Sequence, residues 1–418
     1  MKIKSIFSDS GRLILWRLFA LLISLITSIF LARTLGPEDR GVLMLIMLTI
    51  TLLTVFFQLG IPEASIYFWG QKNLKKEILI RQLFTIVLIL GFSGAVINII
   101  LHTYIYPQGI NMYVISFCIF QGIVSALFRH IIISIGTYNI YGLLNLLEFF
   151  LYLIGLLIVY HYSFLNINNI IMIYAVSLIV PFFINMLIVY RVYGLTIFIL
   201  DFDYSFLKRV ISKGIHLLFI GIGGFLTLRL NYFFIDSIMG ARSTGLFTVA
   251  NTIPSAALNI PQQVATVIYA HTAKNHGPTT DRSMIPFIVR WMLLISIIVV
   301  SIFASVSRMI TLLIFGEEYI EISSLVPVLL LAAGVGGTAN IVFNALAGSG
   351  RHYIGTYTTL IGLGSVGVSG LIFIPQYDFY GACVGILIGN TLNLLLCIQH
   401  YCKLKQVDFR EFIWKIEK

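Results

Sequence analysis

The chain has 418 residues, of which 59% are hydrophobic and 11% are charged, and its formal net charge is +10. A soluble globular domain carries about 25% charged residues, so this composition excludes a soluble fold. Apolar runs of about 18 residues or more recur along the chain, and each is long enough to cross a bilayer as a helix. The ten-residue alternation typical of membrane β-barrels does not occur in the sequence. The sequence therefore predicts an all-α polytopic membrane protein.

The hydropathy pattern predicts about twelve transmembrane helices. They cover residues 11–33, 42–65, 80–102, 112–134, 142–161, 170–190, 215–239, 245–270, 286–308, 323–346, 354–375 and 380–402. An even number of spans places both termini on one side of the membrane. Most of the 27 lysines and arginines fall on that side, and cytoplasmic loops are enriched in basic residues. We therefore expect both termini to be cytoplasmic, and the positive charge predicts topology rather than a nucleic acid partner.

Two short glycine-bounded turns resemble each other. The segment LARTLGPEDRGVL aligns with IDSIMGARSTGLF, so that Gly36 matches Gly240 and Gly41 matches Gly245, each pair 204 residues apart. The longest loop separates two sets of six spans. We therefore predict two six-helix lobes, residues 1–190 and 215–402, joined by a cytoplasmic linker at 191–214 and followed by a cytoplasmic tail at 403–418. Because six is even, the lobes form a parallel pseudo-repeat.

One arginine lies deep in the predicted membrane region. Arg229 is 14 residues into the seventh span, about 21 Å from its cytoplasmic end at 1.5 Å per residue. An arginine near the bilayer centre costs about 2.5–3.5 kcal/mol unless it meets water or a partner. Either it pairs with Asp236, two turns further along the same face, or it binds an anionic substrate. The planar guanidinium suits phosphate oxygens.

Other polar residues also lie within the predicted spans. Asn251 and Asn259 share one face of the eighth span, which indicates either a water-filled cavity or hydrogen bonding between helices. Arg17 lies inside the first span, and Arg290 in the ninth is expected to anchor its helix at the interface. Glu148 in the fifth span is either a proton or cation site or the partner of an arginine on another span.

The sequence contains no pattern typical of an enzyme or a metal protein. It shows no nucleophile–base pair, phosphate-binding loop or cluster of metal ligands. The four cysteines fall in apolar segments without metal-binding spacing. We expect no catalytic activity, no metal and no bound cofactor.

Three segments carry a resemblance to a known family. They are FLARTLGPEDRGVLML after the first span, IDSIMGARSTGLFTVANTIP at the seventh and eighth spans, and LLIFGEEYIEISSLVPVLL before the tenth. In order and spacing they resemble the Wzx-type O-antigen flippases, a polysaccharide flippase family within the multidrug/oligosaccharidyl-lipid/polysaccharide exporter superfamily. The likeness covers essentially the whole chain.

The resemblance implies a MATE-like transporter in the bacterial inner membrane. It would carry undecaprenyl-diphosphate-linked oligosaccharide to the periplasmic leaflet by alternating access, coupled to an H⁺ or Na⁺ gradient. A polysaccharide polymerase, a chain-length regulator and membrane lipids would be its partners. By the same resemblance, Arg17 and Arg229 bind the diphosphate, together with Arg33 and Arg290. The chain departs from the pattern because few intramembrane charges follow the ninth span and no acidic residue marks a coupling-ion site.

Two other functions are compatible with the predicted architecture. A multidrug exporter of the same superfamily would favour acidic residues in its cavity, whereas the deep charge here is Arg229. A membrane-embedded polysaccharide polymerase would be expected to have a sizeable outer loop with catalytic residues, but the predicted outer loops are short. A structural scaffold would leave the buried arginines unexplained.

Overall fold

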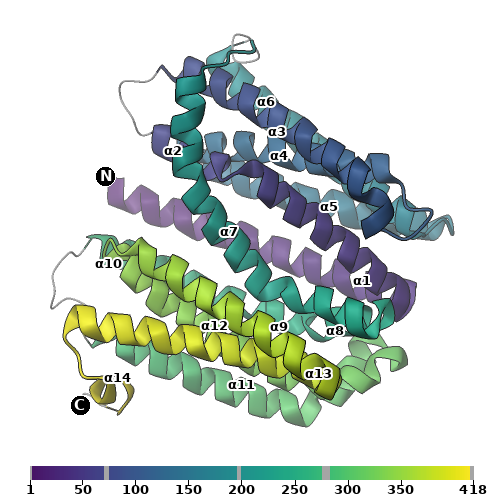
Figure 1. The fold of residues 1–418 in the computed structure, drawn as a ribbon, viewed down its shortest axis with the longest axis vertical. Coiled ribbons are helices and arrows are strands. Elements are labelled where there is room, and N and C mark those ends of the chain that lie inside the picture. Colours follow the sequence, from purple (N-terminus) through teal and green to yellow (C-terminus); the bar gives the residue numbers. More distant parts are fainter. Residues whose placement is uncertain (1, 70–74, 195–198, 275–282, 415–418) are drawn as a thin grey trace. The chain divides into compact units, whose positions relative to one another are not determined.

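The computed structural model of the chain describes residues 2–69, 75–194, 199–274 and 283–414. Every regular element within these ranges is a helix (Figure 1). The chain forms two compact units. The first comprises Met1–Thr27 with Ile46–Ile222, and the second comprises Ser28–Leu45 with Gly223–Lys418. The predicted all-α fold is confirmed.

The first unit is built around α4. Its helices are α2 (Ile61–Trp69), α3 (Lys76–Ile105), α4 (Met112–Ile135), α5 (Tyr138–His161) and α6 (Ile167–Tyr193), with parts of α1 (Lys2–Gln58) and α7 (Tyr204–Met239). Helix α4 packs against α2, α3, α5 and α6. Buried residues recur every fourth position on one of its faces, at Ile115, Ile119, Ile123, Leu127 and Ile131. This apolar stripe forms the core of the first unit.

The second unit contains the remaining helices. They are α8 (Ala241–Ala250), α9 (Thr252–Ala257), α10 (Asn259–Lys274), α11 (Met284–Phe315), the 3₁₀ helix η2 (Glu317–Ile322), α12 (Leu325–Gly348), α13 (His352–Lys405) and α14 (Phe409–Trp414). Helix α12 packs against α10, α11 and α13 (Figure 1). Gly337 of α12 admits the ring of Pro261, because a Cβ at this position would lie 2.8 Å from the proline Cβ. The core of the second unit lies along α12.

The two resembling turns have the same backbone conformation. Gly36 has φ 72° and ψ 173°, and Gly240 has φ 85° and ψ 173°. A positive φ at this position favours glycine. Each glycine breaks the helical path, within α1 in the first case and between α7 and α8 in the second. The alignment of the turns in the sequence therefore corresponds to a real structural equivalence.

Eight helices among the described residues are long and apolar enough to cross a membrane. Two of them, α1 and α13, each contain two predicted spans, and they bend at Gly36 and at Tyr377–Asp378 respectively. The predicted seventh span lies within α7. The predicted eighth span is divided among α8, α9 and α10, each too short to cross alone. Together these helices describe a multi-pass membrane protein.

In the segment predicted as a linker, 191–214, residues 195–198 lie outside the described ranges, and most of the others are helical. Helix α6 continues to Tyr193 and α7 begins at Tyr204, because the Asp203 side chain accepts hydrogen bonds from the backbone of Ser205 and Phe206. The predicted tail is also structured in part: Phe412 of α14 is buried against the ring of Tyr401. The predicted lobes, 1–190 and 215–402, stay a prediction. The two compact units divide the chain differently, since Ser28–Leu45 belongs to the second unit.

Candidate functional site

Arg229 is half-buried in α7 and does not pair with Asp236. Its guanidinium lies over the ring of Phe225, 4.8 Å from the ring centroid, and it forms no ion pair with any described residue. Side chains on a helix lean toward its N-terminus, so Arg229 reaches back to Phe225, one turn earlier. Asp236 lies about 10 Å further along the helix axis in the other direction. The hypothesis of an intrahelical Arg229–Asp236 pair is therefore wrong.

Tyr232 is the buried polar group next to Arg229. It is only 4% exposed, and its hydroxyl accepts a hydrogen bond of 2.8 Å from the side-chain amide of Asn251. Asn251 occupies the break between α8 and α9, where the interrupted helix turns its side chain toward α7. The ring of Tyr232 also packs edge-on against Phe247. The predicted site residues Arg229 and Asn251 are thus brought together by Tyr232.

A second arginine, Arg40, belongs to the same group. Arg229 and Arg40 are both charged neighbours of Tyr232. The Nη2 atom of Arg40 donates a 3.0 Å hydrogen bond to the hydroxyl of Ser28, which lies 3.4 Å from the Thr252 hydroxyl. We call this set the arginine cluster: Ser28, Arg40, Arg229, Tyr232, Asn251 and Thr252, all in the second unit. Two arginines near one buried tyrosine form a cationic region that suits an anion with several oxygens.

Arg40 was missed by sequence reasoning because it lies in a turn predicted to be outside the membrane. Its hydrogen bond to Ser28 joins the two halves of α1 across the bend at Gly36. The signal that could have found it is the turn resemblance, in which Arg40 directly precedes Gly41, the counterpart of Gly245 in α8. The fold of the turn, and not the hydropathy, brings Arg40 toward α7.

Three other predicted site residues make contacts with backbone carbonyls. Arg33 is exposed, and its guanidinium donates to the carbonyls of Leu313 and Ile314 near the C-terminus of α11. Arg290 donates from Nε to the carbonyl of Pro286, one turn earlier in α11. Asn259 donates to the carbonyls of Ser255 and Ala256. These contacts hold helix ends and turns, and none of them joins the arginine cluster.

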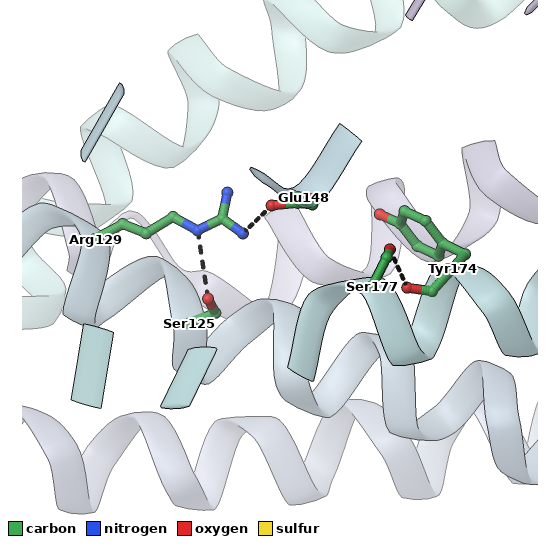
Figure 2. A network of polar contacts seen from close by, with 5 residues as sticks. All are labelled: Ser125, Arg129, Glu148, Tyr174 and Ser177. Carbon is green, nitrogen blue, oxygen red and sulfur yellow. Dashed lines mark hydrogen bonds and ion pairs between the residues drawn. The ribbon is translucent and has the colours of Figure 1, made fainter. Parts of the chain in front are cut away.

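The first unit contains a separate ionic network, drawn in Figure 2. Arg129 of α4 forms a 2.6 Å ion pair with Glu148 of α5 and donates a 3.3 Å hydrogen bond to Ser125. Tyr174 of α6 lies on the far side of the carboxylate, and its carbonyl accepts a hydrogen bond from Ser177. Of the two interpretations of Glu148, the structure supports an arginine partner. A role in ion coupling is a separate question that these contacts leave as a prediction.

Arg17 lies in the first unit and is exposed. The preceding residue, Trp16, packs on Gly142 of α5, where a Cβ would lie 2.6 Å from the indole Cδ1. This contact places the N-terminal part of α1 beside the start of α5. Arg17 therefore belongs to the same part of the molecule as the network around Arg129 and Glu148, and it is not part of the arginine cluster.

Solved structures with this fold are membrane transporters. An inward-facing MATE-family multidrug resistance transporter of the MOP superfamily has a TM-score of 0.71 at 16% identity, covering 93% of this chain and 96% of that one. A MOP superfamily transporter from Pyrococcus furiosus, described as having a binding pocket of reverse polarity that suggests a different function, has a TM-score of 0.66 at 15% identity over 95% of each chain. The Vibrio cholerae MATE transporter VcmN in its bent form has a TM-score of 0.62 at 14% identity, covering 98% and 100%. The chain therefore has the MATE transporter fold.

Sequence comparison gives one further match. A family model described as "Polysaccharide biosynthesis protein" matches residues 30–324. Among curated proteins, none matches the sequence. The matched region begins just before the first glycine-bounded turn and ends at the start of α12, so it contains every residue of the arginine cluster except Ser28.

Proposed function

Because the chain belongs to the polysaccharide biosynthesis protein family, we propose that it is a flippase for undecaprenyl-diphosphate-linked oligosaccharide. It carries an O-antigen or similar repeat unit across the bacterial inner membrane by alternating access, with both termini in the cytoplasm. A multi-pass membrane protein with a transporter fold suits this task, since the sugars and the diphosphate cannot cross hydrocarbon unaided. The polyprenyl tail remains in the bilayer while the polar head passes through the protein.

The observation that supports this function is the half-buried guanidinium of Arg229. It pairs with no carboxylate among the described residues, and burying an uncompensated charge is unfavourable. A diphosphate supplies the missing negative charge, and its oxygens match the planar fork of arginine. Arg40 is a charged neighbour of the same Tyr232, so a second arginine adds positive charge to this region. The hydrogen bond from Asn251 holds the Tyr232 side chain in place within the cluster.

The remaining parts of the proposal concern coupling and partners. We expect the transport cycle to be driven by an H⁺ or Na⁺ gradient, with Glu148 and Asp236 as the acidic groups that take part. The polysaccharide polymerase and the chain-length regulator act on the exported repeat unit in the periplasm, and the substrate itself enters from the surrounding membrane lipids.

The decisive experiment replaces Arg229 in a strain that lacks its own flippase. The Arg229→Ala variant should abolish surface polysaccharide while the protein remains in the membrane at normal level. Arg229→Lys should restore export only in part, because an ammonium keeps the charge but lacks the planar fork that binds two phosphate oxygens side by side. Arg242→Ala is the matched control, since Arg242 is 65% exposed and lies 3.7 Å from Glu321. Normal export by Arg229→Ala would remove this residue from the site.

A multidrug exporter is the second candidate, because one of the similar solved structures is a MATE-family multidrug resistance transporter. Cationic drugs favour acidic cavities, whereas the arginine cluster is cationic. Expression of the chain in a drug-sensitive strain discriminates the two functions. Increased resistance to cationic drugs, combined with no rescue of polysaccharide export, would support the drug exporter and overturn the flippase.

A further inference from the structure

The ends of four helices meet at one rim of the first unit: the end of α2, the start of α3, the end of α6 and the start of α7. The ring centroids of Phe68 and Phe206 are 5.6 Å apart, and those of Trp69 and Tyr193 are 5.8 Å apart. Lys76, at the start of α3, donates a hydrogen bond to the carbonyl of Trp69. Because α3 and α6 are each long and apolar enough to cross a membrane, their ends mark the boundary between hydrocarbon and water. The rim therefore lies at the membrane surface.

The first turns of α7 have a buried apolar face and an exposed basic face. Phe206 and Val210, which are four residues apart, are both buried. Arg209 and Lys213, also four residues apart, are both exposed. Residues at this spacing lie on the same face of a helix. The packing of α7 on the first unit thus presents the two cations together at the rim.

The cations at this rim lie on aromatic rings. The pairs, with the distance from the cationic group to the ring centroid, are Lys76 and Trp69 at 5.4 Å, Arg209 and Phe206 at 5.8 Å, and Lys213 and Tyr67 at 5.3 Å. Three of the four such pairs among the described residues are here, so they are concentrated at one place. The ring face attracts the cation and restricts its side chain, while N–H groups remain able to bind an anion. We call these six residues the basic–aromatic patch.

The positive charge of the patch is uncompensated at Arg209 and Lys213. Neither side chain forms an ion pair with a described residue. Asp203 is close enough to Arg209 for a weak charge interaction, but its Oδ1 atom accepts the hydrogen bonds that begin α7. Glu77 lies on the other side of the patch, near Tyr193. An anion at the rim is therefore attracted chiefly to Arg209 and Lys213.

Exposed apolar side chains flank these cations. They are Ile66 and Tyr67 of α2, with Ile199, Leu200, Phe202 and Tyr204 before and at the start of α7. Tyrosine is enriched at membrane interfaces, and basic residues beside an apolar surface attract anionic lipids. A soluble anion has no part that contacts these apolar side chains. A phospholipid offers a phosphate to the cations and an acyl chain to the apolar surface.

We propose that the basic–aromatic patch binds the headgroup of an anionic phospholipid of the surrounding membrane. Arg209 holds the phosphate with its planar fork, and Lys213 adds a second positive charge. The bound lipid fixes the start of α7, the helix that runs from the first unit into the second. This lipid site goes beyond the proposed function, since it is the same whichever substrate the protein carries.

The test is thermal unfolding of the purified full-length protein in detergent, titrated with phosphatidylglycerol or with phosphatidylcholine. A lipid that binds the folded state raises the unfolding temperature, and the titration gives its apparent affinity. The wild-type protein should bind phosphatidylglycerol more tightly. The double variant Arg209→Gln/Lys213→Gln should weaken that lipid about 10- to 30-fold, or about fivefold for each lost cation, and leave phosphatidylcholine unchanged. Equal affinity of the wild type for both lipids, or an unaltered preference in the variant, would overturn the site.

Lys403→Gln/Arg410→Gln is the matched control. It also removes one lysine and one arginine from exposed positions, at the end of α13 and in α14. Neither residue lies over an aromatic ring of the described chain. This variant should keep the full preference for phosphatidylglycerol. A loss as large as in the patch variant would show that only the overall charge matters, and would overturn the patch as a specific site.

Variants of Tyr67 test the aromatic part of the patch. Tyr67→Phe keeps the ring under Lys213 and should bind phosphatidylglycerol as the wild type does. Tyr67→Leu keeps every charge but removes the ring, and should weaken binding about 2- to 5-fold. Because Tyr67 is exposed, both variants should fold normally. Wild-type affinity in Tyr67→Leu would overturn the arrangement in which the ring positions Lys213.

Inorganic phosphate separates a lipid from a free anion. At equal ionic strength, phosphate and chloride should reduce phosphatidylglycerol binding to the same extent, because both act only by screening. If phosphate alone raises the unfolding temperature of the wild type but not of Arg209→Gln/Lys213→Gln, the patch is a site for a soluble anion and the lipid site is overturned.

Discussion

Gly41 and Gly245 lie in direct backbone contact within the second unit. A Cβ at residue 41 would overlap the carbonyl of Ala241, and a Cβ at residue 245 would overlap the carbonyl of Pro37. Each hypothetical Cβ would lie 2.9 Å from the backbone nitrogen of the opposite glycine. The shift of 204 residues that aligns the two turns converts one contact into the other. The two turns therefore cross in a self-complementary way, like the two sides of a two-fold interface.

Substitution at this crossing should be costly. Gly41→Ala places a methyl group against rigid backbone atoms, which cannot move aside as a flexible side chain could. We expect the free energy of unfolding to fall by about 1–3 kcal/mol or more, and Gly245→Ala should behave in the same way. Thermal unfolding of the purified variants in detergent measures the effect. Because both substitutions separate the same two segments, the double variant should lose less than the sum of the single losses.

Gly364→Ala is the control for this prediction. Gly364 lies within α13, and a Cβ there would meet no atom within 4 Å. Since alanine is the better helix former, this variant should be as stable as the wild type or slightly more so. Equal losses at positions 41 and 364 would show that the crossing is not tight in the membrane.

Arg33→Ala should reduce stability without changing affinity for undecaprenyl diphosphate. Arg33 donates two hydrogen bonds to carbonyls near the end of α11, where a cation also interacts favourably with the helix dipole. We expect a loss of about 0.5–1.5 kcal/mol, measured by thermal unfolding beside a binding assay. Arg308 is an exposed residue of α11. The control variant Arg308→Ala should change neither the stability nor the affinity. A weaker affinity with unchanged stability would instead return Arg33 to the substrate site.

Arg129 and Glu148 should be coupled in a double-mutant cycle. Both side chains are largely shielded from solvent, at 26% and 14% exposure. Glu148→Gln leaves Arg129 without its counter-charge, and Arg129→Met leaves the carboxylate unpaired, so each should lose about 1–3 kcal/mol. The double variant should lose clearly less than the sum. Strictly additive losses in thermal unfolding would show that the 2.6 Å pair contributes no interaction energy.

The first turn of α7 should loosen in acid. The Ser205 hydroxyl, together with the backbone N–H groups of Ser205 and Phe206, donates hydrogen bonds to Asp203 and lowers the pKa of its carboxyl below the ordinary 3.8. A lowered folded-state pKa means that the stabilisation is fully present above the unfolded pKa. It is lost as the pH falls through the folded-state value. Amide exchange at residues 204–210, corrected for the intrinsic rate, should therefore speed up below about pH 4.

Asp203→Asn separates the cap from its titration. Asparagine accepts the same backbone hydrogen bonds at a helix N-cap, but its side chain does not titrate between about pH 2 and pH 7. The variant should keep α7 protected at neutral pH and show a much weaker acid response. An unchanged acid response in Asp203→Asn would place the titrating group elsewhere.

The turn resemblance was readable in the sequence because a positive φ demands a specific residue type. Gly36 and Gly240 share that requirement. The glycines therefore recur at matching positions of the two turns, although the apolar residues around them differ. Hydropathy similarly predicted the apolar helices, since the bilayer fixes their length. The breaks in the eighth span, at Asn251 and Leu258, were missed because neither residue is a glycine or a proline. Pro254 and Pro261 each come three residues after a break.

The partners of the charged side chains could not be predicted from the sequence. The depth of Arg229 and of Glu148 follows from counting residues along a helix. The partner of Glu148 is Arg129, 19 residues away on another helix, and the neighbour of Arg229 is Phe225 rather than Asp236. Arg33 was grouped with the substrate-binding arginines but contacts α11, some 280 positions further along the chain. Spacing along one helix does not reveal which face of another helix is opposite.

The sequence by itself determined the helical fold, the apolar spans and the equivalence of the two turns, because bilayer thickness and backbone sterics act on each segment locally. Only the tertiary structure decided that Gly41 crosses Gly245, that Arg40 and Arg229 are both neighbours of Tyr232, and that Glu148 pairs with Arg129. These relationships depend on how helices distant in sequence pack. Packing is set by the shapes of whole helix faces, which no single segment encodes.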